Sequence, residues 1–480
     1  MDDRKPHIVI IGAGLGGCFL ADSLADSCQV TIVELGSTLP LLQDRVCDKD
    51  KSAVTYPHIC SGLGGTTKLW HNGLIEIHDT VFEHRWPFRK SELAPYYEAA
   101  FFKLAGRRRS EISDGARSLL AKYVAVGFPE SCFGDWLYYP KKRINPWYAF
   151  NLSGRVNLVE GEAVRMVVDS RGRVRSVLVR TKPNGPDEQI LGDIFVLAAG
   201  GLGTPLLLNT LNKDAKAPIA RHIGFHYEDH PCALVGELVL DEPLYKLWNY
   251  PCAGGNLRLP LVLWQDGLQV SFQLRPAAHS WIMKPHSRVK SVLSDLRNKP
   301  FTLAPYIGLL THWDDIMEVL SFKLGVNLPT RHYQLLMVAE QPPSQSCAVW
   351  RDGEVPTFFR RWIIQPDQIH AYEVAFKQVL NLLGHKVATV KLFPDWQANI
   401  FSSSHHSGTA RMAGSEREGV CDMNGLVFGS GNLYVCDGSA IPGTGIANTG
   451  LTIAALALRL ASHLREHMRL SGEKRVAPQT

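Results

Sequence analysis

Paired cysteines are missing from this chain. Its 480 residues contain ten cysteines, and no two of them form a C-x-x-C pair. Scattered cysteines in a long chain are typical of reduced, mostly buried thiols. The first expected strand begins by residue 7, which leaves no room for a signal peptide ahead of it. Both features predict a cytoplasmic protein.

Long apolar runs, basic tracts and repeats are missing as well. No apolar run reaches the roughly 18 residues that span a bilayer, so we expect no transmembrane segment. The net charge is only +5 and no basic tract concentrates it, which argues against nucleic acid as a partner. No G-x-S-x-G motif occurs, which disfavours a serine hydrolase. The length is enough for two or three domains with a large buried core.

What is present begins with a motif near the N-terminus. The β-branched run His7–Ile11 predicts a strand buried on both faces. Gly12, Gly14 and Gly17 follow at G-x-G-x-x-G spacing, in the sequence GAGLGG. In this motif the first glycine permits a sharp turn and the second lets backbone approach a pyrophosphate. The third lets the next helix pack against the strand.

A second strand and an acidic residue complete the pattern. Val30–Val33 predicts a strand that ends on Glu34, whose carboxylate can accept hydrogen bonds from both hydroxyls of an adenosine ribose. The phosphates would lie on the N–H groups around Leu15, where the helix dipole favours negative charge. Strand, turn, helix, strand and acid in this order predict a dinucleotide site. The motif alone does not separate NAD from FAD.

A second glycine-rich stretch runs from Ser61 to Gly73 and reads SGLGGTTKLWHNG. Its N–H and hydroxyl donors can wrap a phosphate or the edge of a flat ring. An ordinary glycine-rich turn has the same composition, so both interpretations stay open. Trp86-Pro87 then precedes an expected helix capped by Ser91. Residues 106–150 lack clear periodicity, and we expect a surface excursion rather than core.

The middle of the chain predicts short strands and then a return to the nucleotide-binding domain. Valine-rich segments at 156–159, 163–168 and 174–179 are typical of strands. Asp193–Ala199 predicts a buried strand that runs into two glycines. Thr204-Pro205 predicts the cap and the first residue of the next helix. The nucleotide-binding domain is therefore expected to be built from discontinuous pieces.

Three histidines, His222, His226 and His230, then follow at four-residue intervals. On one helix they would share a face, which suggests a metal site. Gly224 and Pro231 interrupt such a helix. A structural turn is therefore the favoured interpretation, and we expect no metal.

Residues 232–400 are expected to form a second domain. Strand-like segments occur at 232–240, 259–274 and 333–341, among many aromatic residues. Aromatic walls are typical of a small-molecule pocket and equally of any core, so composition decides little here. The apolar stretch 301–313 fits a packed helix or loop better than a lid or a membrane-resting segment.

The last informative stretch contains HHSGTARM, which begins at His405, and then a strand that ends on Asp437. A loop with Asn448 leads into a helix that begins at Leu451. Its free N–H groups offer a second site for stabilising negative charge. A reduced flavin is negative on its pyrimidine side, so a helix N-terminus aimed there would favour reduction.

Together these segments resemble the glucose–methanol–choline (GMC) oxidoreductases, FAD-dependent enzymes that oxidise alcohols. The resemblance depends on GAGLGG with Glu34, the GLGGTTKLW loop, Trp86-Pro87 and the C-terminal block. The C-terminal block is the most specific, because the sequence from His405 resembles the family's H-x-x-G-T-x-R-M. Residues 101–150 and most of 232–395 match only loosely, and in this family those parts line the substrate pocket.

The resemblance implies an α/β (overall α+β) protein with two domains. We expect a Rossmann-like FAD-binding domain from residues 1–80, 152–231 and 400–470. A substrate domain of antiparallel sheet flanked by helices is expected from 81–151 and 232–399, with 471–480 as a tail. The residues expected to contact FAD are Gly12, Gly14, Leu15, Gly17, Glu34, Gly65, Thr66, Thr67, Trp70, Asn72, Gly73, Val164, Ala199, Asp437, Gly438 and Thr449.

The resemblance also implies catalytic residues. His405 stands at the family's catalytic histidine, and Asn448 at its partner, which is His or Asn among members. An imidazole can take a hydroxyl proton near neutral pH, an amide can hold the alkoxide oxygen, and the flavin accepts the hydride. The expected substrate is a small alcohol and the electron acceptor is O2 or another acceptor. His406 is the neighbour most easily confused with His405.

One departure concerns the linkage of the flavin. Some relatives bond it covalently through a histidine in the glycine-rich loop, but the aligned residue here is Leu69, and His71 is out of register. We therefore expect non-covalent, dissociable FAD. A non-redox lyase or decarboxylase that keeps the flavin is the alternative, which intact His405 and Asn448 disfavour. An NAD-dependent dehydrogenase would leave the C-terminal block without a role.

Overall fold

The computed structural model describes residues 5–36, 46–48, 59–70, 72–182, 185–212, 222–241, 244, 247, 250–276, 303, 306–307, 331–351 and 358–476. His71 lies outside the described residues. So does the stretch 301–313, apart from residues 303, 306 and 307.

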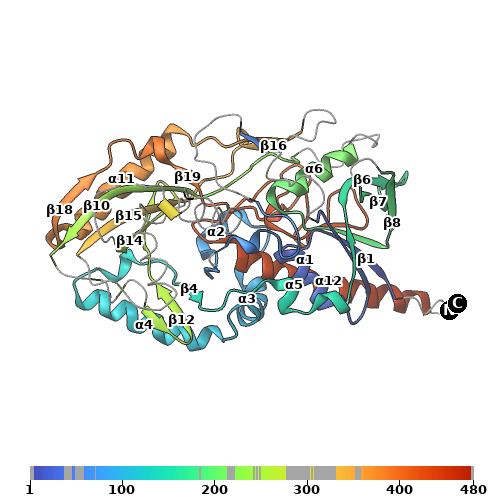
Figure 1. Ribbon diagram of the computed structural model, residues 1–480, viewed down its shortest axis with the longest axis horizontal. Coiled ribbons are helices and arrows are strands. Elements are labelled where there is room, and N and C mark those ends of the chain that lie inside the picture. Colours follow the sequence, from blue (N-terminus) through green and yellow to red (C-terminus); the bar gives the residue numbers. More distant parts are fainter. Residues whose placement is uncertain are drawn as a thin grey trace.

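A five-stranded parallel sheet forms one half of the molecule, at the right of Figure 1. Its strand order is β20-β9-β1-β2-β5, and all four neighbouring pairs are parallel. The strands are β1 (His7–Ile11), β2 (Gln29–Glu34), β5 (Asn157–Glu160), β9 (Ile194–Leu197) and β20 (Leu433–Val435). The central strands are continuous apolar runs because both of their faces are covered. Three distant parts of the chain thus build one sheet.

Helices and a small antiparallel sheet surround this parallel sheet. Helix α1 (Leu15–Leu24) follows β1 and packs against the long C-terminal helix α12 (Thr449–Val476). Helix α12 also packs against α3 (Lys90–Ala105). The antiparallel sheet is β6-β7-β8, and helix α6 packs on β6. Their bounds are β6 (Glu162–Val168), β7 (Val174–Arg180), β8 (Asp187–Leu191) and α6 (Gly200–Asn212).

A six-stranded antiparallel sheet forms the other half, at the left of Figure 1. Its order is β13-β14-β15-β10-β18, and β19 pairs with the start of β10. The strands are β10 (Pro231–Leu240), β13 (Leu261–Gln265), β14 (Leu268–Pro276), β15 (His332–Ala339), β18 (Val387–Leu392) and β19 (Phe401–Ser402). Helix α11 (Pro366–Leu383) covers β13 and β14, and Phe376 stacks on Phe272 with ring centroids 6.3 Å apart. The mixed α/β fold expected from the sequence is confirmed.

Smaller elements connect the two halves. The three-stranded sheets are β11-β12-β4 and β16-β17-β3. Their strands are β3 (Val46–Asp48), β4 (Leu137–Pro140), β11 (Tyr250–Cys252), β12 (Gly255–Arg258), β16 (Ala348–Trp350) and β17 (Phe358–Arg361). The remaining helices described here are α2 (Asp79–Arg85), α4 (Arg109–Ala125) and α5 (Pro146–Ala149).

Two expectations about residues 81–150 are wrong. Residues 109–125 form helix α4, whose face of Ile112, Ala116, Leu119 and Tyr123 is buried. The 4-3-4 spacing of this face is helical, but charged residues between its members hide it. Helix α3 is not capped by Ser91: it begins at Lys90, and Glu92 accepts the backbone N–H of Arg89.

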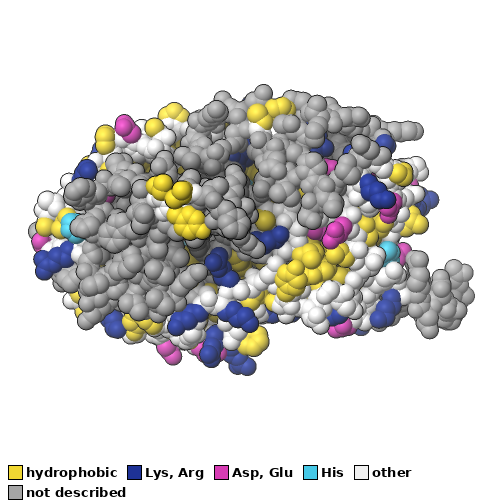
Figure 2. Space-filling view, in the orientation of Figure 1, with side chains coloured by type: hydrophobic (Ala, Val, Ile, Leu, Met, Phe, Trp, Pro, Cys, Tyr) yellow, Lys and Arg dark blue, Asp and Glu magenta, His cyan; other side chains and the backbone are white. Residues whose placement is uncertain are grey.

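No helix of the described residues is long and apolar enough to cross a membrane. Figure 2 shows Lys and Arg side chains scattered over the described part of one face, with Asp and Glu between them.

Candidate active site

The glycines in the turn after β1 have two different structural roles. Gly12 has a φ of +114°, and a Cβ there would lie 2.3 Å from the Ala198 carbonyl oxygen. A Cβ at Gly17 would lie 2.1 Å from the Gly12 oxygen. At Gly14, the N-cap of α1, the nearest such atom is 3.9 Å away. Gly12 and Gly17 are therefore required by protein packing, whereas the space beside Gly14 is a cradle that a Cβ would fill.

Glu34 holds two glycine-rich loops together. One carboxylate oxygen accepts the N–H of Ala13 at 2.7 Å, and the other accepts the N–H of Gly62 at 2.7 Å. The side chain is buried at the end of β2. Because each carboxylate oxygen has more than one lone pair, the same group can still accept ribose hydroxyls.

The stretch 61–73 packs directly on the glycine turn. The N–H of Gly64 donates to the Ala13 oxygen at 2.9 Å, and a Cβ at Gly65 would lie 3.0 Å from the Gly14 Cα. Both threonine hydroxyls are used within the loop. Thr67 donates to the Gly64 oxygen at 2.6 Å, and Thr66 accepts the N–H of Cys60 at 3.3 Å. These hydroxyls shape the loop around Gly14.

Asn72 and Trp70 carry buried polar atoms without partners. The Asn72 side chain is fully buried at a φ of +60°, and neither its amide nitrogen nor its oxygen has a hydrogen-bond partner among the described residues. The Trp70 indole nitrogen is likewise unpartnered within that part of the chain. Leaving a buried donor or acceptor unpaired costs about 1–3 kcal/mol. Both side chains therefore fit a ligand that offers donors and acceptors at this loop.

The C-terminal block closes on this loop. The Asn448 amide donates to the Gly73 oxygen at 3.2 Å. Gly450 lies against the Trp70 ring, since a Cβ there would be 2.1 Å from a ring carbon. Thr449 is buried at the start of α12. The glycine-rich loop 61–73 and the C-terminal block thus meet.

Two further expected contacts lie at the ends or irregularities of strands. Val164 lies at a bulge of the β6–β7 ladder, between the paired residues Ala163 and Arg165. Ala199 follows β9, and its nitrogen is 3.1 Å from the position of a Cβ on Gly12. Leu15 is buried at the first position of α1.

The loop Ser402–Ser407 carries the expected catalytic histidine. The Nδ1 atom of His405 lies 2.9 Å from the Ser403 hydroxyl. The His405 ring contacts the His230 ring edge to face, with centroids 5.0 Å apart. Nε2 of His230 lies 3.0 Å from the Ala447 oxygen, beside Asn448. His230 therefore joins His405 to the segment just before Asn448. Burial lowers the pKa of His230 and favours its neutral ring.

A buried carboxylate, Asp229, organises this loop. It accepts the backbone N–H of His405 at 3.0 Å and of His230 at 2.8 Å, and the hydroxyls of Ser402 and Ser403 donate to it. Burial raises its pKa, but the hydrogen bond and charge of His406 and the Ser402 hydrogen bond outweigh this and hold the pKa well below its usual range. Asp229 is therefore ionised near neutral pH.

Asp229 reaches the loop through sheet pairing. Antiparallel pairing aligns Pro231 with Ser402 and Glu228 with Ser407, which sets the intervening residues opposite each other. The segment with His222, His226 and His230 is turn and extended chain, with Gly224 at a φ of +82°. Within the described ranges, no group of His, Cys, Asp and Glu is arranged to hold a metal ion.

The geometry separates His405 from its neighbour. Nδ1 of His406 lies 2.7 Å from the Tyr227 hydroxyl and 3.4 Å from Asp229. The His406 backbone oxygen closes on Gly201, where a Cβ would lie 2.4 Å away. His406 is turned toward Tyr227 and Asp229, whereas His405 faces His230.

The expected helix cap at Thr204-Pro205 is wrong, because α6 begins at Gly200 and Pro205 lies inside it. Pro205 has no N–H to donate to the Gly201 oxygen one turn earlier. The Thr409 hydroxyl donates to that oxygen instead, at 2.7 Å. Thr409 therefore joins the histidine loop to α6.

Asp437 holds the start of α6 against the C-terminal block. One carboxylate oxygen accepts the N–H of Gly200 at 2.8 Å and the Thr204 hydroxyl, and the other accepts the N–H of Ser439 at 2.8 Å. Gly438 is required beneath the histidine loop, since a Cβ there would lie 2.6 Å from the His406 oxygen. Sequence reasoning missed Gly16, whose Cβ would lie 1.9 Å from the Cys436 oxygen.

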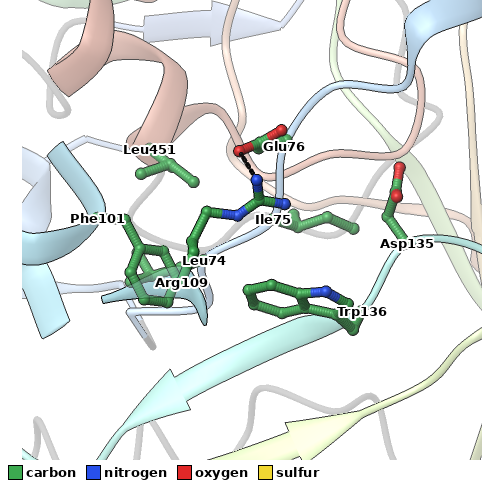
Figure 3. A pocket seen from close by; sticks show the side chains of 8 residues that line it. All are labelled: Leu74, Ile75, Glu76, Phe101, Arg109, Asp135, Trp136 and Leu451. Atoms are coloured by element: carbon green, nitrogen blue, oxygen red, sulfur yellow. Dashed lines mark ion pairs between the residues drawn. The ribbon is translucent and has the colours of Figure 1, made fainter. Parts of the chain in front are cut away.

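A small charged pocket lies just beyond Gly73 (Figure 3). Glu76 and Arg109 form an ion pair of 2.8 Å, and the guanidinium lies 5.2 Å from the Trp136 ring centroid. Burial raises the pKa of Glu76, which Arg109 and Lys90 oppose. The other lining residues are Leu74, Ile75, Phe101, Asp135 and Leu451. This ion pair fixes the segment after Gly73 against α4 rather than offering a large open cavity.

Comparison with known families supplies the deciding observation. Residues 365–457, which include His405 and Asn448, match the C-terminal family model described as GMC oxidoreductase. The chain carries a GMC oxidoreductase C-terminal domain. The FAD expected of GMC oxidoreductases suits the cradle at Gly14 and the unpartnered amide of Asn72.

Solved structures share this fold over nearly the whole chain. Pyridoxine 4-oxidase from Mesorbium loti aligns with a TM-score of 0.64 and 17% identity, covering 96% of this chain and 99% of that one. An FAD-dependent oxidoreductase from Chaetomium thermophilum gives 0.62 and 14%, covering 97% and 100%. Formate oxidase of Aspergillus oryzae gives 0.60 and 15%, covering 98% and 99%. At these identities the likeness shows the fold.

A curated relative matches only a short segment. A long-chain-alcohol oxidase of Arabidopsis thaliana is 33% identical over 70 residues, which is 15% of this chain and 9% of the relative. The match thus spans about a tenth of the length of that relative.

Proposed function

We propose that this protein is an FAD-dependent oxidoreductase that oxidises a C–OH group of a small molecule to an aldehyde or ketone. One observation carries the proposal: Asn448, beside the histidine loop, donates to Gly73 of the glycine-rich loop. The same loop packs on the glycine turn through Gly64 and Gly65. The dinucleotide motif and the C-terminal block would therefore border one site. The alternative is a non-redox lyase or decarboxylase on the same scaffold, which the intact pair His405 and Asn448 disfavours.

The residues that would hold FAD fall into two groups. Gly14, Leu15 and Glu34 would hold the adenylate and phosphates, because they combine a cradle, a helix N-terminus and a buried carboxylate. Trp70 and Asn72 would face the flavin with their unpartnered polar atoms. Leu69 cannot form a covalent bond to flavin, so we propose a dissociable cofactor. When bound, the flavin supplies the hydride acceptor.

The chain's own residues would perform the proton chemistry. His405 would take the hydroxyl proton of the substrate on its imidazole. Asn448 uses one amide N–H for Gly73, and the second N–H would hold the substrate oxygen as negative charge develops on it. The named relatives act on different compounds, so the alcohol is a proposal from the site and not from their names.

The test is an anaerobic screen of alcohols that follows bleaching of the flavin absorbance. We expect at least one alcohol to bleach the wild-type flavin. The His405→Ala variant should still bind FAD but reduce it about 100- to 10,000-fold more slowly, the usual range for a general base. His222→Ala, which removes an imidazole near Arg417, serves as a matched control. A His405→Ala variant with full activity would remove His405 from the mechanism.

A further inference from the structure

A continuous hydrogen-bonded line joins the His405 ring to Asp229 through Ser403. Nδ1 of His405 lies 2.9 Å from the Ser403 hydroxyl oxygen. The same hydroxyl donates to Asp229 at 2.9 Å. The same carboxylate oxygen also accepts the backbone N–H of His405 at 3.0 Å. One oxygen of Asp229 therefore holds the His405 backbone directly and the His405 ring through Ser403.

The direction of each hydrogen bond follows from the carboxylate. An ionised carboxylate only accepts, so the Ser403 proton must point to Asp229. The hydroxyl oxygen then accepts from the His405 ring, which requires a proton on Nδ1. In the neutral ring the other nitrogen, Nε2, is then the basic one.

We propose that Ser403 and Asp229 are positioning residues that fix the tautomer of His405, so that Nε2 receives the substrate proton. This inference rests on the proposed role of His405 as the base. Ser403 touches the ring, and Asp229 acts on the ring through Ser403. The pair also stabilises the positive imidazolium that forms after proton transfer, because Asp229 is negative.

The surroundings of the ring support this assignment. Asp229, His230 and His406 lie around the ring, and Arg360 reaches the Tyr227 hydroxyl at 3.4 Å. His230 is kept neutral by burial, so the negative charge of Asp229 is the group that the imidazolium meets through Ser403.

Ser402 provides a matched control. Its hydroxyl also donates to Asp229, and it accepts the N–H of Ser404 at 3.0 Å, so the hydrogen bonds it makes within the described part of the chain do not include one to the imidazole. A merely structural role for the serine contacts predicts similar effects for Ser402→Ala and Ser403→Ala. The tautomer assignment predicts different effects.

The experiment measures the rate of anaerobic flavin reduction against pH in the FAD-loaded enzyme. For Ser403→Ala we expect a rate about tenfold lower, with substrate affinity within about twofold, and an acid limb at lower pH because the imidazolium loses its link to Asp229. Ser403→Thr should restore both. Ser402→Ala should keep the wild-type acid limb, whatever its stability.

A second measurement does not depend on turnover. In protein labelled with 15N-histidine, the wild-type His405 signal, assigned by its loss in His405→Gln, should show a proton on Nδ1, and Ser403→Ala should shift the population toward Nε2–H. An unchanged tautomer, or equal pH shifts in the two serine variants, would overturn the inference. If His405→Gln itself keeps full activity, the proposed function fails instead, and the two failures are distinguishable.

Discussion

The glycine turn is held by the buried carboxylate of Glu34, and the histidine loop is held by that of Asp229. The two carboxylates differ in how far along the chain their partners lie. Glu34 accepts N–H groups only 21 and 28 residues away. Asp229 accepts from Ser402, Ser403 and His405, which are 173 to 176 residues away. The first arrangement joins two neighbouring segments of the chain, the glycine turn and the loop at Gly62. The second exists only after β10 and β19 have paired.

This difference predicts how each half fails when it is altered. Local spacing shapes the turn, so single backbone changes should disrupt it. The histidine loop depends on long-range pairing, so its carboxylate should matter more than any residue in the loop itself. The variants below test this contrast in order of decreasing effect.

The largest effect is expected for Asp229→Asn. The asparagine side chain has the same shape as aspartate but no charge. Its NH2 group is a donor and would face N–H and O–H groups that are themselves donors. We expect the free energy of unfolding to fall by about 3–5 kcal/mol, as for a broken buried pair, together with loss of most flavin reduction. Denaturant unfolding and anaerobic reduction measure the two effects. A stable and fully active variant would contradict the role of Asp229.

The next pair, Gly12→Ala and Gly14→Ala, separates packing from binding. At Gly12 the positive φ and the 2.3 Å approach to Ala198 predict a loss of about 3 kcal/mol in unfolding free energy. At Gly14 the new methyl group meets only an atom 3.9 Å away, so the apoprotein should keep its stability. Gly14→Ala should instead weaken FAD binding, because the methyl fills the cradle.

Thermal unfolding of the apoproteins and FAD titration check this pair. Equal losses of stability in both variants would show that Gly14 is another packing residue. The space beside Gly14 would then no longer support an FAD site there.

Glu34→Gln should have an intermediate effect. An amide can accept only one of the two N–H groups that Glu34 holds, so the other, from Ala13 or Gly62, would face a donor. We expect a loss of about 2 kcal/mol in apoprotein stability, the cost of a buried unpaired group, and weaker binding of FAD. An effect as large as that of Asp229→Asn would erase the contrast between the two carboxylates.

These variants also show what the sequence predicts and what it does not. The turn at Gly12 and the acid at Glu34 were predictable because the strand, turn, helix and strand that carry them follow one another within one βαβ unit. Their partners Gly62 and Ala198, which lie outside that unit, were not predictable. Asp229 was not, because the segment around it suggested only a metal site or a turn. Its partners become visible only when β19 lies beside β10.

Two boundaries were missed for related reasons. Helix α6 can contain Pro205 because the hydroxyl of Thr409, more than 200 residues later in the chain, donates to the Gly201 oxygen that the proline cannot pair. Helix α4 was missed because its buried face of Ile112, Leu119 and Tyr123 is interrupted by charge. The family resemblance located His405 and Asn448 but gave no information on what holds them.

At mildly acidic pH the smallest effect is expected at Glu228, next to Asp229. Burial raises its pKa to about 8, against the opposing charges of Arg85 and Arg411. The folded state then keeps a proton that the unfolded chain loses above its ordinary pKa, so stability falls as pH rises from about 4.5 to 8. Glu228→Gln should remove this fall, so its free energy of unfolding should exceed that of the wild type at pH 9 and differ little from it at pH 5.

Urea unfolding across this pH range measures the trend, with the exposed Glu83→Gln as a control. A difference that stays constant with pH would show that the Glu228 proton is not linked to folding.

The two segments held by Glu34 and Asp229 should meet around one flavin, and a crystal structure of the FAD-loaded protein would show whether they do. We predict the adenosine at Glu34, the phosphates at Gly14, and the flavin ring between Asn72 and the pair His405 and Asn448. An FAD bound elsewhere, or a ring beyond the reach of His405, would contradict the account.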